Sequence, residues 1–131
     1  MQKLLVLLLR LAGTVMVMAF LAVLLPVDSM AATHRWLGLG EFPRAPIVDY
    51  LARSVALLYG FHGVLVLIVS RDPVRHRTIV WYLAVMNMLF GAIIVAIDLH
   101  AGLPSAWTLL EGPPVIAFGI VIGLLNHQSG R

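Results

Sequence analysis

The chain has 131 residues, of which 61% are hydrophobic and 11% are charged. Ordinary soluble domains have about 45–50% apolar and about 25% charged residues, and a chain this short leaves a large fraction of its surface facing solvent. These values exclude a water-soluble fold, and the absence of cysteine excludes a disulfide scaffold and thiolate metal sites. The formal net charge of +3 does not indicate nucleic-acid binding, because the nine Lys and Arg residues are spread along the chain.

Four apolar stretches predict membrane-spanning helices, each of which needs about 20 mostly apolar residues. The first covers residues 4–25, ends at Pro26 and has Arg10 as its only charge. Its length of about 22 residues exceeds the apolar core of a signal peptide, roughly 7–15 residues. We therefore expect this segment to be retained as the first span.

The loop between the first two spans, residues 26–49, is the longest segment outside the predicted membrane helices. Residues 30–42 of this loop contain both apolar and polar side chains. The apolar ones are Trp36, Leu37, Leu39 and Phe42, and the polar ones are His34, Arg35 and Glu41. This mixture favours a short helix lying in the lipid headgroup layer.

The second span covers residues 50–70, the third residues 78–97 and the fourth residues 106–125. If the fourth begins only at Pro113, it has about 13 residues, which predicts a tilted helix, a thinned membrane or a bend at Pro113 and Pro114. The predicted fold is an all-α, integral membrane four-helix bundle with a short interfacial helix. It forms a single transmembrane domain over residues 1–131.

The positive charges predict the orientation of the spans. With four spans, both termini and the loop at residues 71–77 share one side of the membrane. That side carries six positive residues, which are Lys3, Arg10, Arg71, Arg75, Arg77 and Arg131. The other side carries three, which are Arg35, Arg44 and Arg53. By the positive-inside rule, both termini face the cytoplasm.

Small residues predict how the spans associate, because helices in lipid are held by close backbone approach rather than by the hydrophobic effect. Ala52, Ala56 and Gly60 follow one another at a spacing of four in the second span, and Gly119 and Gly123 form a G-x-x-x-G pair in the fourth. Such stripes serve packing inside one bundle or contact with a second copy of the chain, and the sequence leaves both open.

Three polar residues are expected at one depth in the inner half of the membrane. At 1.5 Å per residue, His62 and Asn87 lie roughly 12–14 Å from the cytoplasmic ends of their spans, and Arg10 lies about 10 Å deep. One hypothesis is a proton relay or a ligand site. The other is a structural hydrogen bond between His62 and Asn87, with Arg10 extending to the headgroups.

Acidic and imidazole side chains gather at the opposite, outward ends of the spans. Asp98 and His100 end the third span, Glu111 lies near the start of the fourth, and Asp49 and Arg53 begin the second. We expect all five near one interface. Three interpretations are open: helix caps and salt bridges, an acid–base or proton-linked binding site, or a divalent metal site in which His34 or His100 joins Asp98 and Glu111. No motif with metal-ligand spacing is present in the sequence, so no metal ligand, cofactor or catalytic residue is assigned.

Four spans, a longer outward first loop and short later loops resemble the small DoxX-like membrane proteins and related four-helix families. Residues 36–43 and 50–54 and the run Glu111-Gly112-Pro113 carry a similar resemblance to bacterial membrane proteins of no assigned activity. The resemblance implies a bacterial inner-membrane protein and carries over no catalytic residue.

Taken together, these features predict a non-catalytic membrane module. Its partner is a lipid-like or quinone-like small molecule, a second copy of the chain or a partner membrane protein. The alternative is a proton-coupled carrier or a small membrane enzyme with an acid and His site at the outer mouth.

Overall fold

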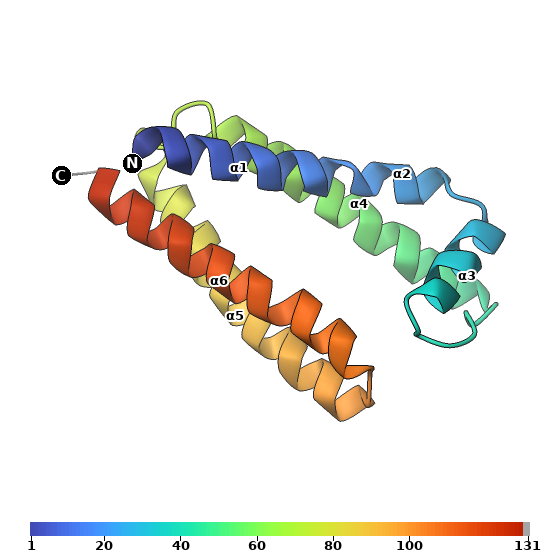
Figure 1. The fold of residues 1–131 in the computed structure, drawn as a ribbon. Helices are drawn as coiled ribbons and strands as arrows, with labels where there is room; N and C mark the ends of the chain where they lie inside the picture. Colours follow the sequence, from blue (N-terminus) through green and yellow to red (C-terminus); the bar gives the residue numbers. More distant parts are fainter. Residues whose placement is uncertain (130–131) are drawn as a thin grey trace. The chain divides into compact units, whose positions relative to one another are not determined.

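The computed structural model describes residues 1–129, which form α-helices and connecting turns (Figure 1). Arg131, counted above among the cytoplasmic charges, lies outside the described residues. The all-α fold is confirmed, and the elements are consistent with the predicted bundle. The helices in chain order are α1 (Gln2–Val17), α2 (Ala19–Leu24), α3 (Val27–Trp36), α4 (Pro46–Val69), α5 (Arg77–Ala101) and α6 (Ser105–Ser129).

Four helical segments are long and apolar enough to cross a membrane, which makes the chain a multi-pass membrane protein. They are Gln2–Leu24, Pro46–Val69, Arg77–Ala101 and Ser105–Ser129. Each coincides with one predicted span and extends it by a few residues at one end or both, apart from small differences at the carboxyl ends of the first two. The third span gains a full turn, so that Asp98 and His100 lie within α5 rather than after it.

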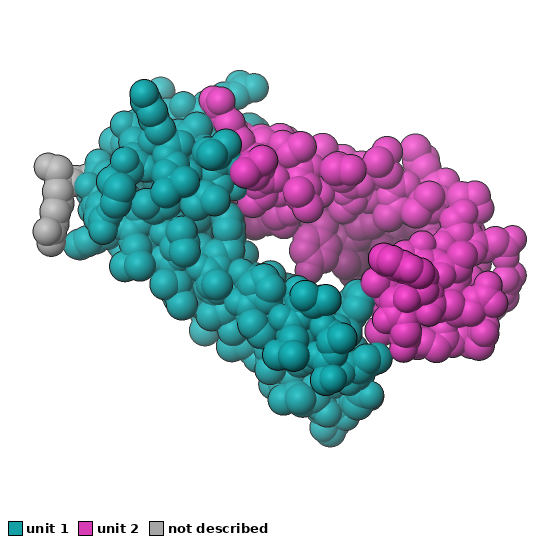
Figure 2. Space-filling view, in the orientation of Figure 1, with its two compact units in different colours: residues 1–9, 68–131 teal, residues 10–67 magenta. Residues whose placement is uncertain are grey.

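The chain divides into two compact units, shown in different colours in Figure 2. We call residues 10–67 the amino-terminal unit, and residues 1–9 together with the chain from Ile68 onward the hairpin unit.

The first span consists of α1 and α2 separated by a turn at Met18, and its part from Arg10 onward belongs to the amino-terminal unit. Met18 keeps a right-handed helical backbone, with φ −61° and ψ −18°, and its N–H still bonds to the Thr14 carbonyl. The span ends at Leu24, one residue before the predicted end, and the backbone of the following Leu25 is extended with ψ 136°. The cause is Pro26, because the residue before a proline is biased away from the helical region.

A short helix is present in the first loop, as predicted, but it lies earlier than the mixed segment suggested. Helix α3 begins after Pro26 and ends at Trp36. It cannot continue to Phe42 because Gly38 and Gly40 have left-handed backbones, with φ 75° and 84°. His34 then hydrogen-bonds through Nδ1 to the Gly40 carbonyl at 3.0 Å, which turns the loop back toward the helix.

In the hairpin unit, α5 and α6 lie side by side and are joined by a tight turn (Figure 1). Gly102 ends α5 with φ 68°, a conformation that glycine adopts without a steric penalty. Helix α6 begins at Ser105 and passes through Pro113 and Pro114 as one 25-residue element. The prolines therefore do not shorten the fourth span, because the turns before them are helical as well.

Candidate functional site

The loop end of the α5–α6 hairpin holds two buried polar side chains that each have an oxygen without a hydrogen-bond partner among the described residues. Asp98, in the last turns of α5, is 3% exposed, and Thr108, in the first turn of α6, is 7% exposed. The atoms left unpaired are Asp98 Oδ2 and Thr108 Oγ1. An unsatisfied buried polar group costs about 1–3 kcal/mol, so this end of the hairpin is the strongest candidate site.

Helix register brings these two side chains toward each other. A Cβ on Gly112 would contact Val95, so these two residues face each other between the helices. Thr108 lies one turn before Gly112, and Asp98 lies nearly one turn after Val95. Because the two helices are antiparallel, one turn back along α6 and one turn forward along α5 reach the same level of the hairpin. Thr108 and Asp98 therefore lie at one level, on the faces that the two helices turn toward each other.

Glu111 lies beside this buried pair and is half-buried. The Trp107 side chain and the Asp98 carboxyl are both close enough to interact with its carboxyl group. The cluster formed by Asp98, Thr108, Glu111 and Trp107 is hereafter the acid site. It contains two neighbouring carboxyl groups, is partly closed to solvent and is able to accept hydrogen bonds, so a ligand that donates hydrogen bonds from a cationic group would complement it.

Of the five residues predicted at the outward ends, two come together within the hairpin unit and two within the amino-terminal unit, and the convergence of all five at one interface stays a prediction. Asp98 and Glu111 come together in the acid site, whereas His100 is exposed on the last turn of α5. Asp49 and Arg53 pair with each other within α4, with Arg53 Nε 2.9 Å from Asp49 Oδ1. The salt-bridge interpretation therefore describes the α4 pair.

Arg53 also binds the end of the first span, a role that the sequence reasoning missed. Its guanidinium donates to the Val23 carbonyl and, at 3.1 Å, to the Leu25 carbonyl. Carbonyls in the last turn of a helix have no partner within that helix, and Pro26 prevents the chain from supplying one. The signal was present in the sequence as an arginine on the next span and a proline that ends the first.

The inner polar layer stays a prediction. Asn87 donates from Nδ2 to the Leu83 carbonyl of its own helix at 2.7 Å. His62 is half-buried in the amino-terminal unit, and Arg10 is exposed. Asn87 thus already has a partner, and no role as a relay is assigned to the three residues.

The small-residue stripes pack inside each unit. Ala56 and Gly60 are buried, Ala52 is half-buried, and a Cβ on Gly60 would lie 2.5 Å from the ring of Phe20. In the hairpin unit, a Cβ on Gly119 would lie 2.7 Å from the Ala84 carbonyl oxygen. These contacts favour packing within the chain as the role of both stripes.

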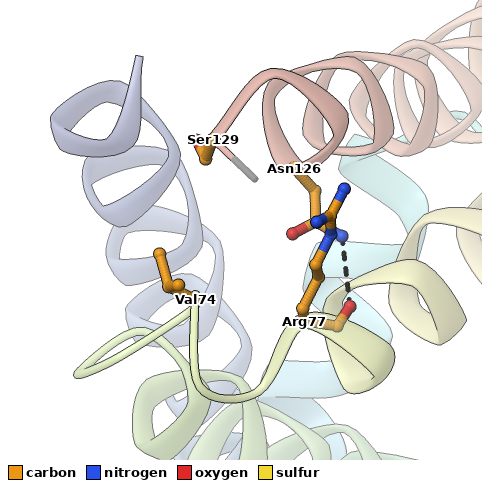
Figure 3. Close-up of a pocket in the computed structure, with 4 residues that line it drawn as sticks. All are labelled: Val74, Arg77, Asn126 and Ser129. Carbon is orange, nitrogen blue, oxygen red and sulfur yellow. Dashed lines mark hydrogen bonds between the residues drawn. The ribbon is translucent and has the colours of Figure 1, made fainter. Parts of the chain in front are cut away.

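A second cluster lies at the opposite end of the same hairpin. Figure 3 shows a cavity of about 220 Å³ at this end. It is lined by Val74 from the loop before α5, by Arg77, the first residue of α5, and by Asn126 and Ser129 from the end of α6. Asn126 is 2% exposed, and its Nδ2 donates to the Arg77 carbonyl at 3.1 Å. Sequence reasoning missed Asn126, although it lies seven residues after Gly119 and thus on the same face of α6.

Within residues 1–129, no group of three or more His, Cys, Asp or Glu side chains could hold a metal ion. The resemblance to the DoxX-like proteins is a prediction from layout and assigns no role to either cluster. Comparisons with protein-family models, curated proteins and solved structures give no match to this chain.

Proposed function

We propose that this protein is a non-catalytic membrane module whose acid site binds a lipid-like molecule with an amine head group. The observation that carries the proposal is the pair of buried, unpartnered oxygens, Asp98 Oδ2 and Thr108 Oγ1. An ammonium group supplies several N–H donors, and the neighbouring Glu111 carboxylate favours its positive charge. The apolar faces of the same helices accommodate the tail, since large side chains such as Leu99 and Leu110 are exposed there.

The proposal includes an orientation and a compartment. An excess of positive residues on the side of the termini supports termini in the cytoplasm of a bacterial inner membrane. The acid site then lies at the outer surface, where amine lipids and small amphiphilic amines have access to it. The resemblance to the DoxX-like proteins is compatible with this arrangement.

The test compares two lipids that differ in their donors. Phosphatidylethanolamine carries an ammonium with N–H groups, whereas the quaternary ammonium of phosphatidylcholine has none. We expect the purified chain to bind the first in preference to the second, measured by native mass spectrometry from mixed-lipid nanodiscs. The double variant Asp98→Asn, Thr108→Val should lose this preference, while His100→Gln, an exposed neighbour, should keep it.

Stability separates this role from a structural one. Thr108→Val is nearly isosteric and removes an unsatisfied oxygen, so the unfolding free energy should stay unchanged or rise by about 1 kcal/mol. Thermal or denaturant unfolding in detergent checks this. A loss of more than about 1 kcal/mol would show that the hydroxyl already has a structural partner, and it would contradict the binding role.

The neighbouring Asp98 and Glu111 carboxyls also support a second candidate, a proton-coupled carrier. Protons and cationic ligands would compete for the same oxygens in such a protein. Reconstitution into proteoliposomes with an imposed pH gradient distinguishes the two. Binding without gradient-driven uptake supports the module, whereas uptake that disappears in Glu111→Gln supports the carrier.

A further inference from the structure

The cavity at the other end of the hairpin has the composition of an anion site. Arg77, which is half-buried, brings a guanidinium, and Asn126 and Ser129 bring polar side chains that also donate to the carbonyls of Arg77 and Leu125 (Figure 3). Arginine presents donors in a planar fork that matches phosphate oxygens. Among the residues that the structure describes, those that line this cavity carry no carboxylate.

The backbone of Arg77 is held in place, which makes the cavity a built feature of the hairpin. Asn126 is almost fully buried and uses its amide to bind the Arg77 carbonyl across the two helices. Arg77 is also the first residue of α5, and the first hydrogen bond within this turn runs from the Val80 N–H to the His76 carbonyl. The preceding N–H groups of α5 thus have no acceptor within the helix and add to the positive potential there.

The surrounding loop strengthens this potential. Residues 71–77 contain three arginines and one aspartate, a formal charge of +2 with His76 neutral. The aspartate, Asp72, accepts a hydrogen bond from the Arg75 N–H at 3.0 Å, so its carboxylate is engaged by the loop backbone.

The size of the cavity selects the part of a ligand that it can hold. Its volume is about 220 Å³. Pockets for whole drug-sized ligands are larger, about 300–1,000 Å³. The cavity therefore holds a head group, and any apolar chains must lie outside it, where Val121 and Leu124 of α6 are 41% and 58% exposed.

We propose that this cavity binds the phosphate of an anionic phospholipid, with Arg77 as the principal ligand and Asn126 as the residue that positions it. The cavity lies where α5 begins and α6 ends, so it is at the level of the headgroups, where basic pockets recognise anionic lipids. The site shares no residue with the acid site and does not depend on the proposed function.

The test titrates the full chain in neutral detergent with short-chain phosphatidylglycerol, short-chain phosphatidylcholine and inorganic phosphate. Phosphatidylglycerol should bind more tightly than phosphatidylcholine, with saturation at one per chain. Arg77→Gln should weaken this binding roughly 20-fold, the effect of losing a charge-assisted hydrogen bond, and Arg77→Lys should retain part of it. Neither change affects the bond from Asn126, which is made to the backbone.

Arg75→Gln is the matched control, because it removes an equal charge from an exposed side chain of the same loop. It should weaken binding no more than about fivefold, the effect of one charge near a membrane surface. Equal effects of the Arg75 and Arg77 variants would overturn the site in favour of diffuse attraction. Inorganic phosphate that binds as tightly as the lipid would overturn the lipid as the ligand, and equal binding of the two lipids would overturn recognition of the anionic phosphate.

Discussion

Replacing Gly119 by alanine is expected to destabilise the protein by about 2–3 kcal/mol, whereas the same change at Gly123 should leave stability unchanged or raise it. A Cβ on Gly119 would lie 2.7 Å from the Ala84 carbonyl oxygen and 3.0 Å from the Met88 N atom. Both are backbone atoms, so α5 and α6 would have to move apart locally. Unfolding in detergent, followed by helical circular dichroism, measures the difference.

Gly123 is the matched control because it lies one turn further along the same face of α6. A Cβ there would lie 3.4 Å from the Ala84 Cβ and 3.5 Å from the Trp81 ring, which is ordinary van der Waals contact. Alanine is also favoured over glycine within a helix by about 1 kcal/mol. Equal losses at the two positions would contradict the close approach of α5 and α6 at Gly119.

Arg53→Gln is expected to lower the unfolding free energy by about 1.5–3 kcal/mol, the range for hydrogen bonds made by a charged group. The guanidinium binds two carbonyls at the end of the first span and the Asp49 carboxylate, and glutamine can replace at most part of this set. The loss leaves helix-terminal carbonyls unpaired and a carboxylate without its partner. Denaturant unfolding of the purified variant checks the expected loss.

Arg44→Gln serves as the control for removing a positive charge from the same unit. Its salt bridge to Asp28 is 2.6 Å long, but both side chains are largely exposed. Exposed ion pairs contribute about 0–1 kcal/mol, so this variant should unfold close to the unaltered protein. An Arg53 variant as stable as the Arg44 variant would show that the carbonyls of Val23 and Leu25 find other partners.

The number and approximate positions of the spans could be predicted from the sequence, because they depend on local properties. A helix that crosses hydrocarbon must be apolar over about 20 residues and satisfies its backbone hydrogen bonds internally. The end of the first span was equally local, since Pro26 acts on the residue next to it. The bounds of α3 and the continuity of α6 through Pro113 and Pro114 were harder to predict from the sequence. Segments that contain glycine or proline can adopt more than one backbone conformation.

The composition of the candidate sites needed the tertiary structure. Spacing placed Gly119 and Gly123 on one face, yet only the contacts with α5 distinguish a close backbone approach from an ordinary one. The same holds for Asp98, whose burial and neighbour Thr108 follow from the register between two helices. It holds as well for Asn126, whose partner is 49 positions away along the chain.

The sequence by itself thus determined that this chain forms membrane-spanning helices. The length of the apolar segments and the hydrogen bonds within each helix are enough to predict this. Only the tertiary structure decided which polar groups are buried together, since that depends on how one helix is shifted and rotated against the next. One-dimensional spacing specifies the face on which a residue lies, and it leaves open which residue of another helix it meets.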